Sequence, residues 1–387
     1  MLSFESAIIP RMPSRTASSV SRRGFLKAAG AGLAASPLAA RTAAAQLRVP
    51  DPPGPKLGWA VVGLGSLAIN QIMPAFAKCE RAKLVAFVSG HRDKAEKLAA
   101  RYGVATKNIY NYENYDSIKD NPEIDVVYVV LPNSMHAEYT IRALKAGKHV
   151  LCEKPMANTA ADCEQMVEAG RAAGRKLMIA YRLHYEPFNN ALIKVVRDQE
   201  FGKLRVVLAD AGFPIGDPTQ WRLNRKMAGG GSMMDIGIYA LNAARYLTGE
   251  EPAEVHAMMD TTPNDPRFKE VEENITFQLR FPSGVLANCT SSYGVPLNRF
   301  RVVGTNGWAE LEPALSYDGL QMRAGTWTKI EERIQPVINH FAAEMDHLVD
   351  CIRNDKQPLT PGEEGLKDMR LIEAVYKSAA TGQSVKT

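Results

Sequence analysis

Several features that define other protein classes are scarce or missing in this sequence. The chain of 387 residues has five cysteines, widely spaced and odd in number, with no C-x-x-C pair and no cluster of cysteine with histidine. Neither a disulfide framework nor a zinc site is therefore indicated, and we expect no metal. The cysteines are expected to be small buried hydrophobes. No run of eighteen apolar residues occurs, so nothing after the N-terminal leader is expected to span a membrane.

The net charge of +5 comes entirely from the N-terminus. Residues 1–45 hold six of the 47 Lys and Arg residues and one of the 42 acids, which leaves 41 of each sign for the rest of the chain. A neutral region without a basic run lacks the electrostatic footprint of a nucleic-acid-binding protein. We therefore expect small-molecule ligands and no nucleic acid.

Residues 1–45 are predicted to be a twin-arginine signal peptide. Ser21–Lys27 reads S-R-R-G-F-L-K, a weakly apolar stretch follows over residues 28–40, and Ala43–Ala45 supplies an A-x-A cleavage site before Gln46. This order predicts export of the folded protein to the periplasm. The alternative is a disordered basic tail.

The next segments predict two domains. Residues 46–57 are rich in proline and are expected to form an extended arm, and residues 58–181 alternate strand-length apolar runs with helical stretches. The expected strands are Gly58–Val62, Leu84–Ser89, Val126–Leu131, Val150–Cys152 and Leu177–Ala180, and the helices between them include His136–Ala146 and Ala160–Ala173. Such alternation is typical of a Rossmann-type, doubly wound parallel sheet within an α/β protein.

Residues 182–387 show a different pattern, which predicts an α+β domain with an open, mainly antiparallel sheet. The expected strands are Glu254–Met259, Asn274–Phe281, Val285–Ser292, Phe300–Val303 and Ala309–Glu312. A helix is expected over Ser232–Leu247, and two more close the chain at His340–Arg353 and Glu363–Ala380. We assign substrate binding and oligomerisation to this domain.

A glycine motif after the first strand predicts dinucleotide binding. The residues Gly63, Leu64, Gly65, Ser66, Leu67 and Ala68 fit G-x-G-x-x-A between a strand and a helix. Glycines there permit a tight turn and close approach of the backbone to a pyrophosphate at a helix N-terminus.

The end of the second strand favours NADP over NAD. NAD sites usually place Asp or Glu there to bond the ribose 2′-hydroxyl, whereas this chain has Ser89, Gly90 and then Arg92 and Lys94. A carboxylate would repel a 2′-phosphate, and these residues offer donors and positive charge. The alternative is that Arg92 and Lys94 are ordinary solvated residues at a helix start.

Two segments carry candidate catalytic groups. Glu153 and Lys154 follow the strand Val150–Cys152, at the sheet edge where ligands bind in this architecture. Asp235 and Tyr239 are spaced i, i+4 on the expected helix, and a tyrosine beside a lysine can carry a proton because a nearby cation lowers its pKa from about 10. The alternative is a core tyrosine bonded to an aspartate, and the spacing alone does not separate the two.

From about residue 57 to its end the chain resembles the glucose–fructose oxidoreductase, inositol dehydrogenase and related family, in particular its exported sugar oxidoreductases. The stretches that carry the resemblance are Gly63–Ala68, Leu131–Glu138, Ala146–Val150, Glu153–Met156, Tyr181–Tyr185, Gln220–Leu223 and Ala228–Tyr239. The resemblance implies that Lys154 lies near the nicotinamide, that Tyr239 is the acid/base, and that Asp235 helps to hold the sugar. It also implies a further active-site tyrosine, Tyr317, and cofactor contacts from Tyr112, Leu131, Pro132, Asn133, His136, Arg182, Trp221 and Arg222.

The chain departs from those relatives in three places. Its proline-rich arm is much shorter, Ser66 stands where the relatives have a lysine, and the segment 317–335 is different and shorter. The assembly, expected to be a homodimer or homotetramer, and the sugar pair are the properties that these departures affect.

The predicted export and the predicted cofactor together indicate a closed reaction cycle, in which two substrates in turn reduce and reoxidise the same bound cofactor. NADP is a cytoplasmic metabolite, so an exported enzyme must carry it out tightly bound and reoxidise it on a second substrate. We therefore expect an aldose such as glucose to be oxidised to its lactone and a second sugar, fructose or another aldose, to be reduced to an alditol by a ping-pong mechanism. The rival functions are a nicotinamide-dependent glycosidase and a non-catalytic sugar-binding protein.

Overall fold

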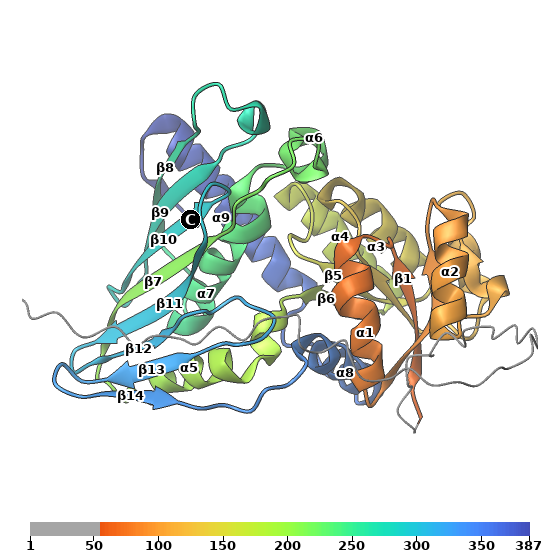
Figure 1. The fold of residues 1–387 in the computed structure, drawn as a ribbon, viewed down its shortest axis with the longest axis horizontal. Coiled ribbons are helices and arrows are strands. Elements are labelled where there is room, and N and C mark those ends of the chain that lie inside the picture. Colours follow the sequence, from red (N-terminus) through yellow and green to blue (C-terminus); the bar gives the residue numbers. More distant parts are fainter. Residues whose placement is uncertain (1–54) are drawn as a thin grey trace, which may run out of the picture. The chain divides into compact units, whose positions relative to one another are not determined.

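The computed structural model describes residues 55–387. The expected signal peptide, and all of the expected arm except residues 55–57, lie outside the described residues. Figure 1 shows a parallel sheet flanked by helices and a second, larger sheet with helices against one face.

The first sheet has six parallel strands in the order β3-β2-β1-β4-β5-β6, which confirms the predicted doubly wound fold. Its strands are β1 (Leu57–Val62), β2 (Ala82–Val88), β3 (Ile109–Tyr110), β4 (Val126–Val129), β5 (His149–Glu153) and β6 (Leu177–Ala180). The strand order reverses between β1 and β4. The carboxyl ends of the strands at such a point form a ligand-binding crevice.

Helices connect these strands and have clear termini. They are α1 (Met73–Ala75), which lies between a π-helical turn (Ala68–Ile72) and a 3-10 turn (Phe76–Lys78), then α2 (Arg92–Tyr102), α3 (His136–Lys145) and α4 (Ala160–Ala173). In α4 the Thr159 side chain accepts a hydrogen bond from the Asp162 backbone N–H, and Gly174 ends the helix with a φ of +58°. An N-cap threonine and a left-handed glycine are the residues that these positions favour.

The second sheet has nine strands in the order β14-β13-β12-β11-β7-β10-β9-β8-β15. Neighbours are antiparallel except β7 and β10, which run parallel. The strands are β7 (Leu204–Gly212), β8 (Glu254–Asp260), β9 (Asn274–Arg280), β10 (Leu286–Ser292), β11 (Leu297–Gly304), β12 (Trp308–Leu311), β13 (Met322–Gly325), β14 (Ile330–Arg333) and β15 (Val385–Lys386). The sheet is mainly antiparallel, as predicted.

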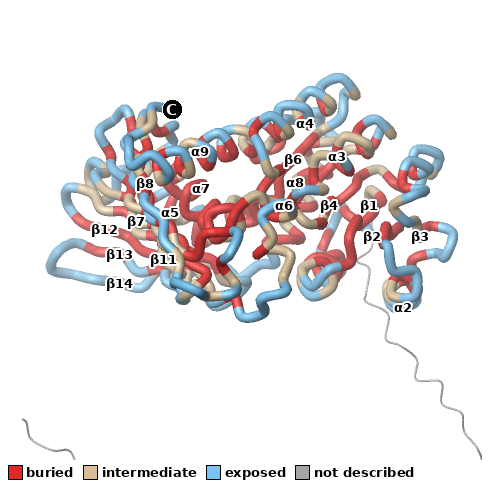
Figure 2. The backbone as a smooth tube through the Cα atoms, turned by 90° about the horizontal axis from the view of Figure 1, so that it is seen from above, coloured by how far each residue is buried: buried red, intermediate tan, exposed pale blue. Residues whose placement is uncertain are grey.

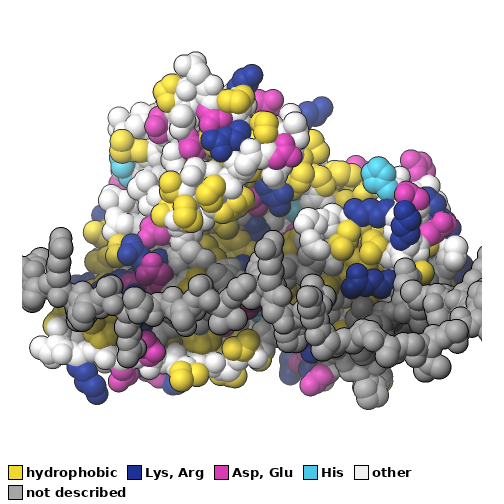
Figure 3. Space-filling model, in the orientation of Figure 1, with side chains coloured by type: hydrophobic (Ala, Val, Ile, Leu, Met, Phe, Trp, Pro, Cys, Tyr) yellow, Lys and Arg dark blue, Asp and Glu magenta, His cyan; other side chains and the backbone are white. Residues whose placement is uncertain are grey.

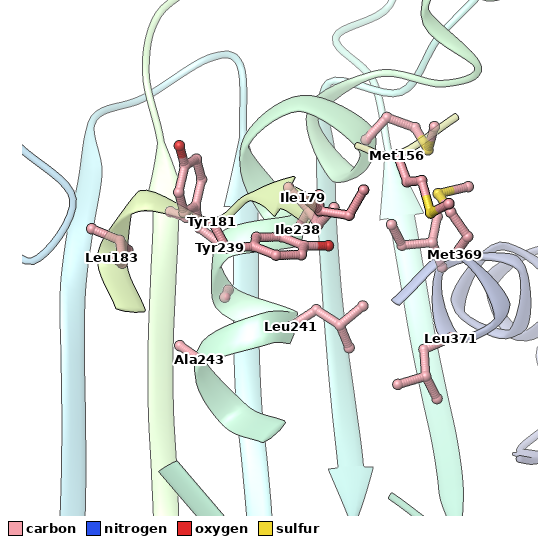
Figure 4. Packing of buried hydrophobic residues seen from close by; sticks show 14 of the residues in the cluster. Met156, Ile179, Tyr181, Leu183, Ile238, Tyr239, Leu241, Ala243, Met369 and Leu371 are labelled. Carbon is pink, nitrogen blue, oxygen red and sulfur yellow. The ribbon is translucent and has the colours of Figure 1, made fainter. Parts of the chain in front are cut away.

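Helices cover one face of this sheet, and the other face carries exposed side chains. These helices include α5 (Pro187–Arg197), α7 (Ile238–Thr248) and α9 (Gly362–Thr381), whereas the short α6 (Arg225–Ala228) packs against the 3-10 turns Asn133–Met135 and Trp221–Leu223. Along β9 the residues alternate between buried and less buried, with Phe277 at 0% and the flanking Gln278 exposed. Figure 4 shows side chains of α7 near Met369 and Leu371 of α9 in the core beneath the sheet.

Helix α8 (His340–Arg353), late in the chain, belongs to the core of the first sheet. Its Phe341, Met345 and Leu348 pack in one buried cluster with Trp59 of β1. The Asp346 carboxylate also accepts hydrogen bonds from the backbone N–H groups of Glu80 and Arg81, each at 2.7 Å. The segment therefore completes a core that begins more than 280 residues earlier in the sequence.

The burial of residues and the distribution of surface charge agree with what the amino-acid composition indicated. Figure 2 shows buried backbone along strands of both sheets and exposed backbone at the connecting loops. All five cysteines are buried, as predicted. Figure 3 shows acidic and basic side chains interspersed on the visible face. Within residues 55–387, no helix is long and apolar enough to cross a membrane.

Candidate functional site

A cleft of about 410 Å³ lies over the carboxyl ends of β1, β2, β4 and β5 and reaches residues of the second half of the chain. Its size is within the range of ligand sites. Its lining is Gly63, Leu64, Gly65, Ser66, Leu67, Ser89, Gly90, His91, Lys94, Tyr112, Val130, Leu131, Pro132, Asn133, His136, Glu153, Lys154, Trp221, Arg222 and Asp235. The sequence predicted all of these as cofactor or catalytic residues except His91 and Val130.

The glycine loop lies at one end of the cleft, and two of its positions favour glycine because glycine has no side chain. Gly63 has a φ of +91°, and a Cβ there would lie 2.3 Å from the Val130 carbonyl oxygen, so only glycine fits without strain. A Cβ on Gly65 would meet nothing within 4 Å, because Gly65 is exposed and lines the cleft. Helical structure starts at Ser66. This strand, turn and helix N-terminus fit a dinucleotide pyrophosphate.

The cleft end beside β2 carries donors and no carboxylate among its lining residues. Ser89 is 5% exposed, and its Oγ accepts a hydrogen bond from the His91 N–H at 3.1 Å. Lys94 lines the same end, and Tyr112 covers Gly90, where a Cβ would lie 3.2 Å from the tyrosine ring. These groups fit a ribose that carries a 2′-phosphate.

Three residues expected at the cofactor do not line the cleft. Arg92 bonds the Glu96 carboxylate at 2.8 Å and the Ile109 carbonyl oxygen at 3.1 Å, so its guanidinium joins α2 to β3. Ala68 is fully buried in the core behind the glycine loop. Arg182 lies at the other end of the site, beside Tyr239. For Arg92 the alternative of an ordinary residue at a helix start is therefore the better description, whereas Lys94 faces the cleft.

Two candidate catalytic residues, Lys154 and Asp235, meet at the other end of the cleft. The Lys154 Nζ donates to the Asp235 backbone carbonyl at 2.5 Å and lies 3.3 Å from the carboxylate Oδ1. It also lies 4.8 Å from the centre of the Tyr239 ring. Burial works to lower the pKa of Lys154, but Tyr239, Asp235 and Glu153 outweigh burial and raise it. Lys154 is therefore a cation next to Tyr239.

The Asp235 carboxylate is held by three groups. Besides Lys154, the Arg222 Nε donates to Oδ2 at 2.9 Å and the Tyr293 hydroxyl donates to the same oxygen at 3.0 Å. Burial favours a higher pKa for Asp235, yet Arg222, Lys154 and the Tyr293 hydrogen bond lower it to about 2. Asp235 bonds two cations and Tyr293 rather than Tyr239, so the alternative of a structural pair between Tyr239 and Asp235 does not describe these two residues.

The local backbone explains how Asp235 and Tyr239 reach the cleft. Asp235 lies in a π-helical turn (Met233–Gly237) that leads into α7, whose second residue is Tyr239. Glu272 fixes the start of this turn, because its carboxylate accepts hydrogen bonds from the N–H groups of Gly231 and Met233, each at 2.9 Å. A Cβ on Gly231 would lie 2.1 Å from the Glu272 carbonyl oxygen, which explains a glycine at this point.

Arg182 and Tyr317 lie beside Tyr239. Arg182 is 6% exposed, donates to the Leu315 carbonyl at 2.5 Å, and has its guanidinium carbon 5.2 Å from the centre of the Tyr239 ring. The same carbon lies 4.7 Å from the centre of the Tyr317 ring. Tyr317 is half exposed and lies on the loop before β13, so the predicted further tyrosine is close to Tyr239.

His136 connects two of the loops that line the cleft. Its Nδ1 lies 2.8 Å from the Pro155 carbonyl oxygen, and its Nε2 lies 2.8 Å from the Leu131 carbonyl oxygen. The ring is 1% exposed, and burial lowers its pKa. His136 therefore holds the segment after Lys154 against the end of β4, a position that the sequence alone did not reveal.

Sequence reasoning missed Tyr293 and Glu272. Tyr293 is fully buried and directly follows β10. The only signal in the sequence was a tyrosine at the carboxyl end of an expected strand. Glu272 lies in a loop of mixed composition, and its partners are 41 and 39 residues away in the sequence.

Comparison with known proteins gives family matches over both halves of the chain. Residues 57–181 match the model described as "Oxidoreductase family, NAD-binding Rossmann fold", and residues 190–310 match the GFO/IDH/MocA C-terminal domain.

Individual relatives align along most of the chain. A D-xylose 1-dehydrogenase [NADP(+)] of Haloarcula marismortui is 33% identical over 85% of this chain and 92% of the relative. A 1,5-anhydro-D-fructose reductase of Ensifer adhaerens is 28% identical over 85% of this chain and 98% of the relative. The crystal structure of aldose-aldose oxidoreductase from Caulobacter crescentus is similar with a TM-score of 0.84 and 54% identity, over 86% of this chain and 100% of that chain.

Proposed function

Because this chain belongs to the GFO/IDH/MocA family of oxidoreductases, we propose that it oxidises one sugar and reduces another on a single NADP that stays bound. The first sugar is an aldose such as glucose, which leaves as its lactone. The second is fructose or another aldose, which leaves as an alditol. The enzyme is a nicotinamide-dependent sugar oxidoreductase, and the two-sugar cycle is the specific proposal.

The choice of NADP rests on the cleft end beside β2. Ser89 and Lys94 line it, and its lining includes no carboxylate that would repel a 2′-phosphate. The Haloarcula relative, named for NADP(+), supports the same choice. When bound, NADP supplies the acceptor and then the donor of the hydride.

The observation that carries the reaction is the position of Lys154. Its Nζ lies between the Asp235 carboxylate and the Tyr239 ring, at the end of the cleft opposite the β2 donors. In the first half of the cycle Tyr239 takes the proton of the C1 hydroxyl, and in the second half it returns that proton to the acceptor oxygen. Lys154 polarises the reacting oxygen, and Asp235 fixes Lys154 and orients the sugar.

Location in the periplasm follows from the twin-arginine pattern of the leader. An exported enzyme has no supply of fresh NADP, so its cofactor must be carried through export and regenerated in place. This reasoning supports tight binding and a ping-pong order of the two sugars. The structural relative named as an aldose-aldose oxidoreductase supports a pair of sugar substrates.

The direct test is product analysis with purified protein, without added cofactor. We expect glucose alone to reduce the bound NADP once, and glucose with fructose or a second aldose to give lactone and alditol over many turnovers. Repeated oxidation of glucose alone would contradict the closed cycle. Hydrolysis of aryl glycosides without net redox would indicate a glycosidase, and sugar binding without a nicotinamide absorbance change would indicate a binding protein.

A further inference from the structure

Arg182 is a buried cation for which the proposed reaction has so far no role. Its side chain is 6% exposed, and no ion pair within 4.0 Å involves it among residues 55–387. Its polar partners are the Leu315 carbonyl and, at 3.5 Å, the His340 ring nitrogen. Burying a charge without a paired charge is costly, so a buried arginine at this position points to a use of its charge.

The aromatic rings around Arg182 show where the charge acts. The guanidinium carbon lies over Tyr239 at 5.2 Å and over Tyr317 at 4.7 Å from the ring centres. Lys154 also lies over the Tyr239 ring, at 4.8 Å. Tyr239 is therefore within reach of two cations, of which Lys154 is paired with Asp235 and Arg182 is not paired with a carboxylate.

The other groups around this site leave the Arg182 charge available. Burial raises the pKa of Glu344 well above its usual range, and both carboxyl oxygens of Glu344 lack a hydrogen-bond partner, so neither oxygen is bonded to Arg182. Burial lowers the pKa of His340 to about 3, so this ring is neutral. The titratable groups that interact electrostatically with Arg182 or Tyr239 are Tyr128, Glu153, Lys154, Tyr246, Tyr317, His340 and Glu344.

We propose that Arg182 acts as a second cation on Tyr239 and stabilises its phenolate, the form that takes the proton from the donor sugar. Arg182 acts through Tyr239 and is a positioning residue rather than a catalytic one. The inference rests on the proposed function, in which Tyr239 is the acid/base. It assigns to Arg182 a role distinct from the cofactor contact that the sequence suggested.

The test compares two substitutions that differ in charge. Arg182→Gln keeps a donor for the Leu315 carbonyl but removes the charge, whereas Arg182→Lys keeps a charge. The rate of reduction of bound NADP by glucose is measured in a single turnover across the pH range in which each protein stays folded. We expect the pH midpoint of the rate to rise by about one unit or more in Arg182→Gln and to return toward the wild-type value in Arg182→Lys. Equal midpoints in wild type and Arg182→Gln would overturn the inference.

A spectroscopic titration separates this inference from the proposed function. The tyrosinate absorbance of the wild type minus that of Tyr239→Phe reports the ionisation of Tyr239 alone. The same difference is then measured between Arg182→Gln and the double variant that carries both Arg182→Gln and Tyr239→Phe. The titration needs no sugar, so it decides the role of Arg182 even if no sugar reduces the cofactor. A titration midpoint that does not move with Arg182→Gln would refute the stabilisation.

Arg182→Met provides a second variant in case Arg182→Gln does not fold. It fills a similar volume without a charge, so the pH midpoint of the rate should rise as it does in Arg182→Gln. An unchanged midpoint in folded Arg182→Met would overturn the inference.

Discussion

The two ends of the cleft are built in different ways. At the glycine loop and the end of β2, the chain offers exposed backbone, with Gly65 leaving open space and Ser89 as a small donor. At the other end the chain offers partly buried side chains, with Lys154, Asp235 and Arg222 joined by ion pairs at 3.3 and 2.9 Å. The first end has room for a large ligand, and the second has charges that are already positioned.

Because the two ends of the cleft are built differently, we expect substitutions at each end to change a different property of the protein. Changes at the open end should alter which cofactor binds and how firmly, with little effect on proton transfer. Changes at the charged end should alter the rate, because preorganised charges act on the transition state. Each of the following experiments tests this separation.

The largest expected effect is at the charged end. Tyr239→Phe removes one oxygen, and loss of a general acid/base typically costs about 10²–10⁴-fold in rate. Both half-reactions should slow, because the same oxygen takes and returns the proton. Single-turnover rates of cofactor reduction by glucose and of reoxidation by the acceptor measure this.

Retention of NADP and the melting temperature are the controls for Tyr239→Phe, and both should be almost unchanged. Near-normal rates in both directions would remove Tyr239 from the mechanism and make Tyr317 the next candidate. A lower melting temperature with normal rates would indicate a structural role.

The next effect is at the open end and concerns cofactor choice. Ser89→Asp places a carboxylate where a 2′-phosphate is expected, and unit charges about 4 Å apart near a protein surface repel by about 4 kcal/mol. We expect the preference for NADP over NAD to fall by about 10²-fold, since solvent screens part of this repulsion. Binding of each cofactor to stripped protein measures the preference.

Ser89→Ala is the matched control, because it removes the hydroxyl without adding charge. It should weaken NADP binding far less than Ser89→Asp does. If the two substitutions have equal effects, the 2′-phosphate does not lie at Ser89.

A smaller effect is expected from Gly65→Ala. The added methyl group meets no protein atom within 4 Å but projects into the cleft, so folding should be unaffected while NADP retention falls about tenfold, or 1.4 kcal/mol. Gly216→Ala, which also meets nothing within 4 Å and lies outside the cleft lining, is the control. Normal retention in Gly65→Ala would show that the cofactor does not approach this backbone.

The smallest effect concerns stability near the charged end. Burial keeps the pKa of Glu344 well above its usual value, so the folded protein holds a proton that the unfolded chain releases as pH rises above 4.5. The wild type should therefore lose stability with rising pH, and Glu344→Gln should escape this loss. The melting temperature of the variant relative to the wild type should rise with pH, whatever constant cost the amide adds.

Glu363→Gln, at an exposed position in the first turn of α9, is the control for this measurement. It should show no such trend with pH. A constant difference between Glu344→Gln and wild type at every pH would mean that Glu344 is ionised in the folded protein.

The open end of the cleft could be predicted from the sequence because its residues are close together in the chain. Gly63–Ala68 joins a strand directly to a helix, and Ser89 and Lys94 follow the next strand, so local pattern places them all. Arg92 was the exception, since its guanidinium bonds Glu96 on the same helix and the Ile109 carbonyl oxygen and does not line the cleft.

The charged end could be predicted only in part. Lys154 and Asp235 were found from a strand end and a helix, but the contacts of Tyr293 and Arg182 depend on tertiary packing across 58 and 133 residues of sequence. Among the strands, β7 was missed although it lies in the middle of its sheet, where β10 and β11 pair with it. Its Leu204–Gly212 sequence has no clear alternation of apolar and polar residues.

Helix α8 has a consequence for the order in which the molecule can form during synthesis. The ribosome releases the N-terminal end first, so all six parallel strands emerge well before residue 340 exists. Until then Trp59 and its neighbours lack the covering that Phe341, Met345 and Leu348 later provide. We therefore expect the core of the first sheet to be completed only after nearly the whole chain has left the ribosome.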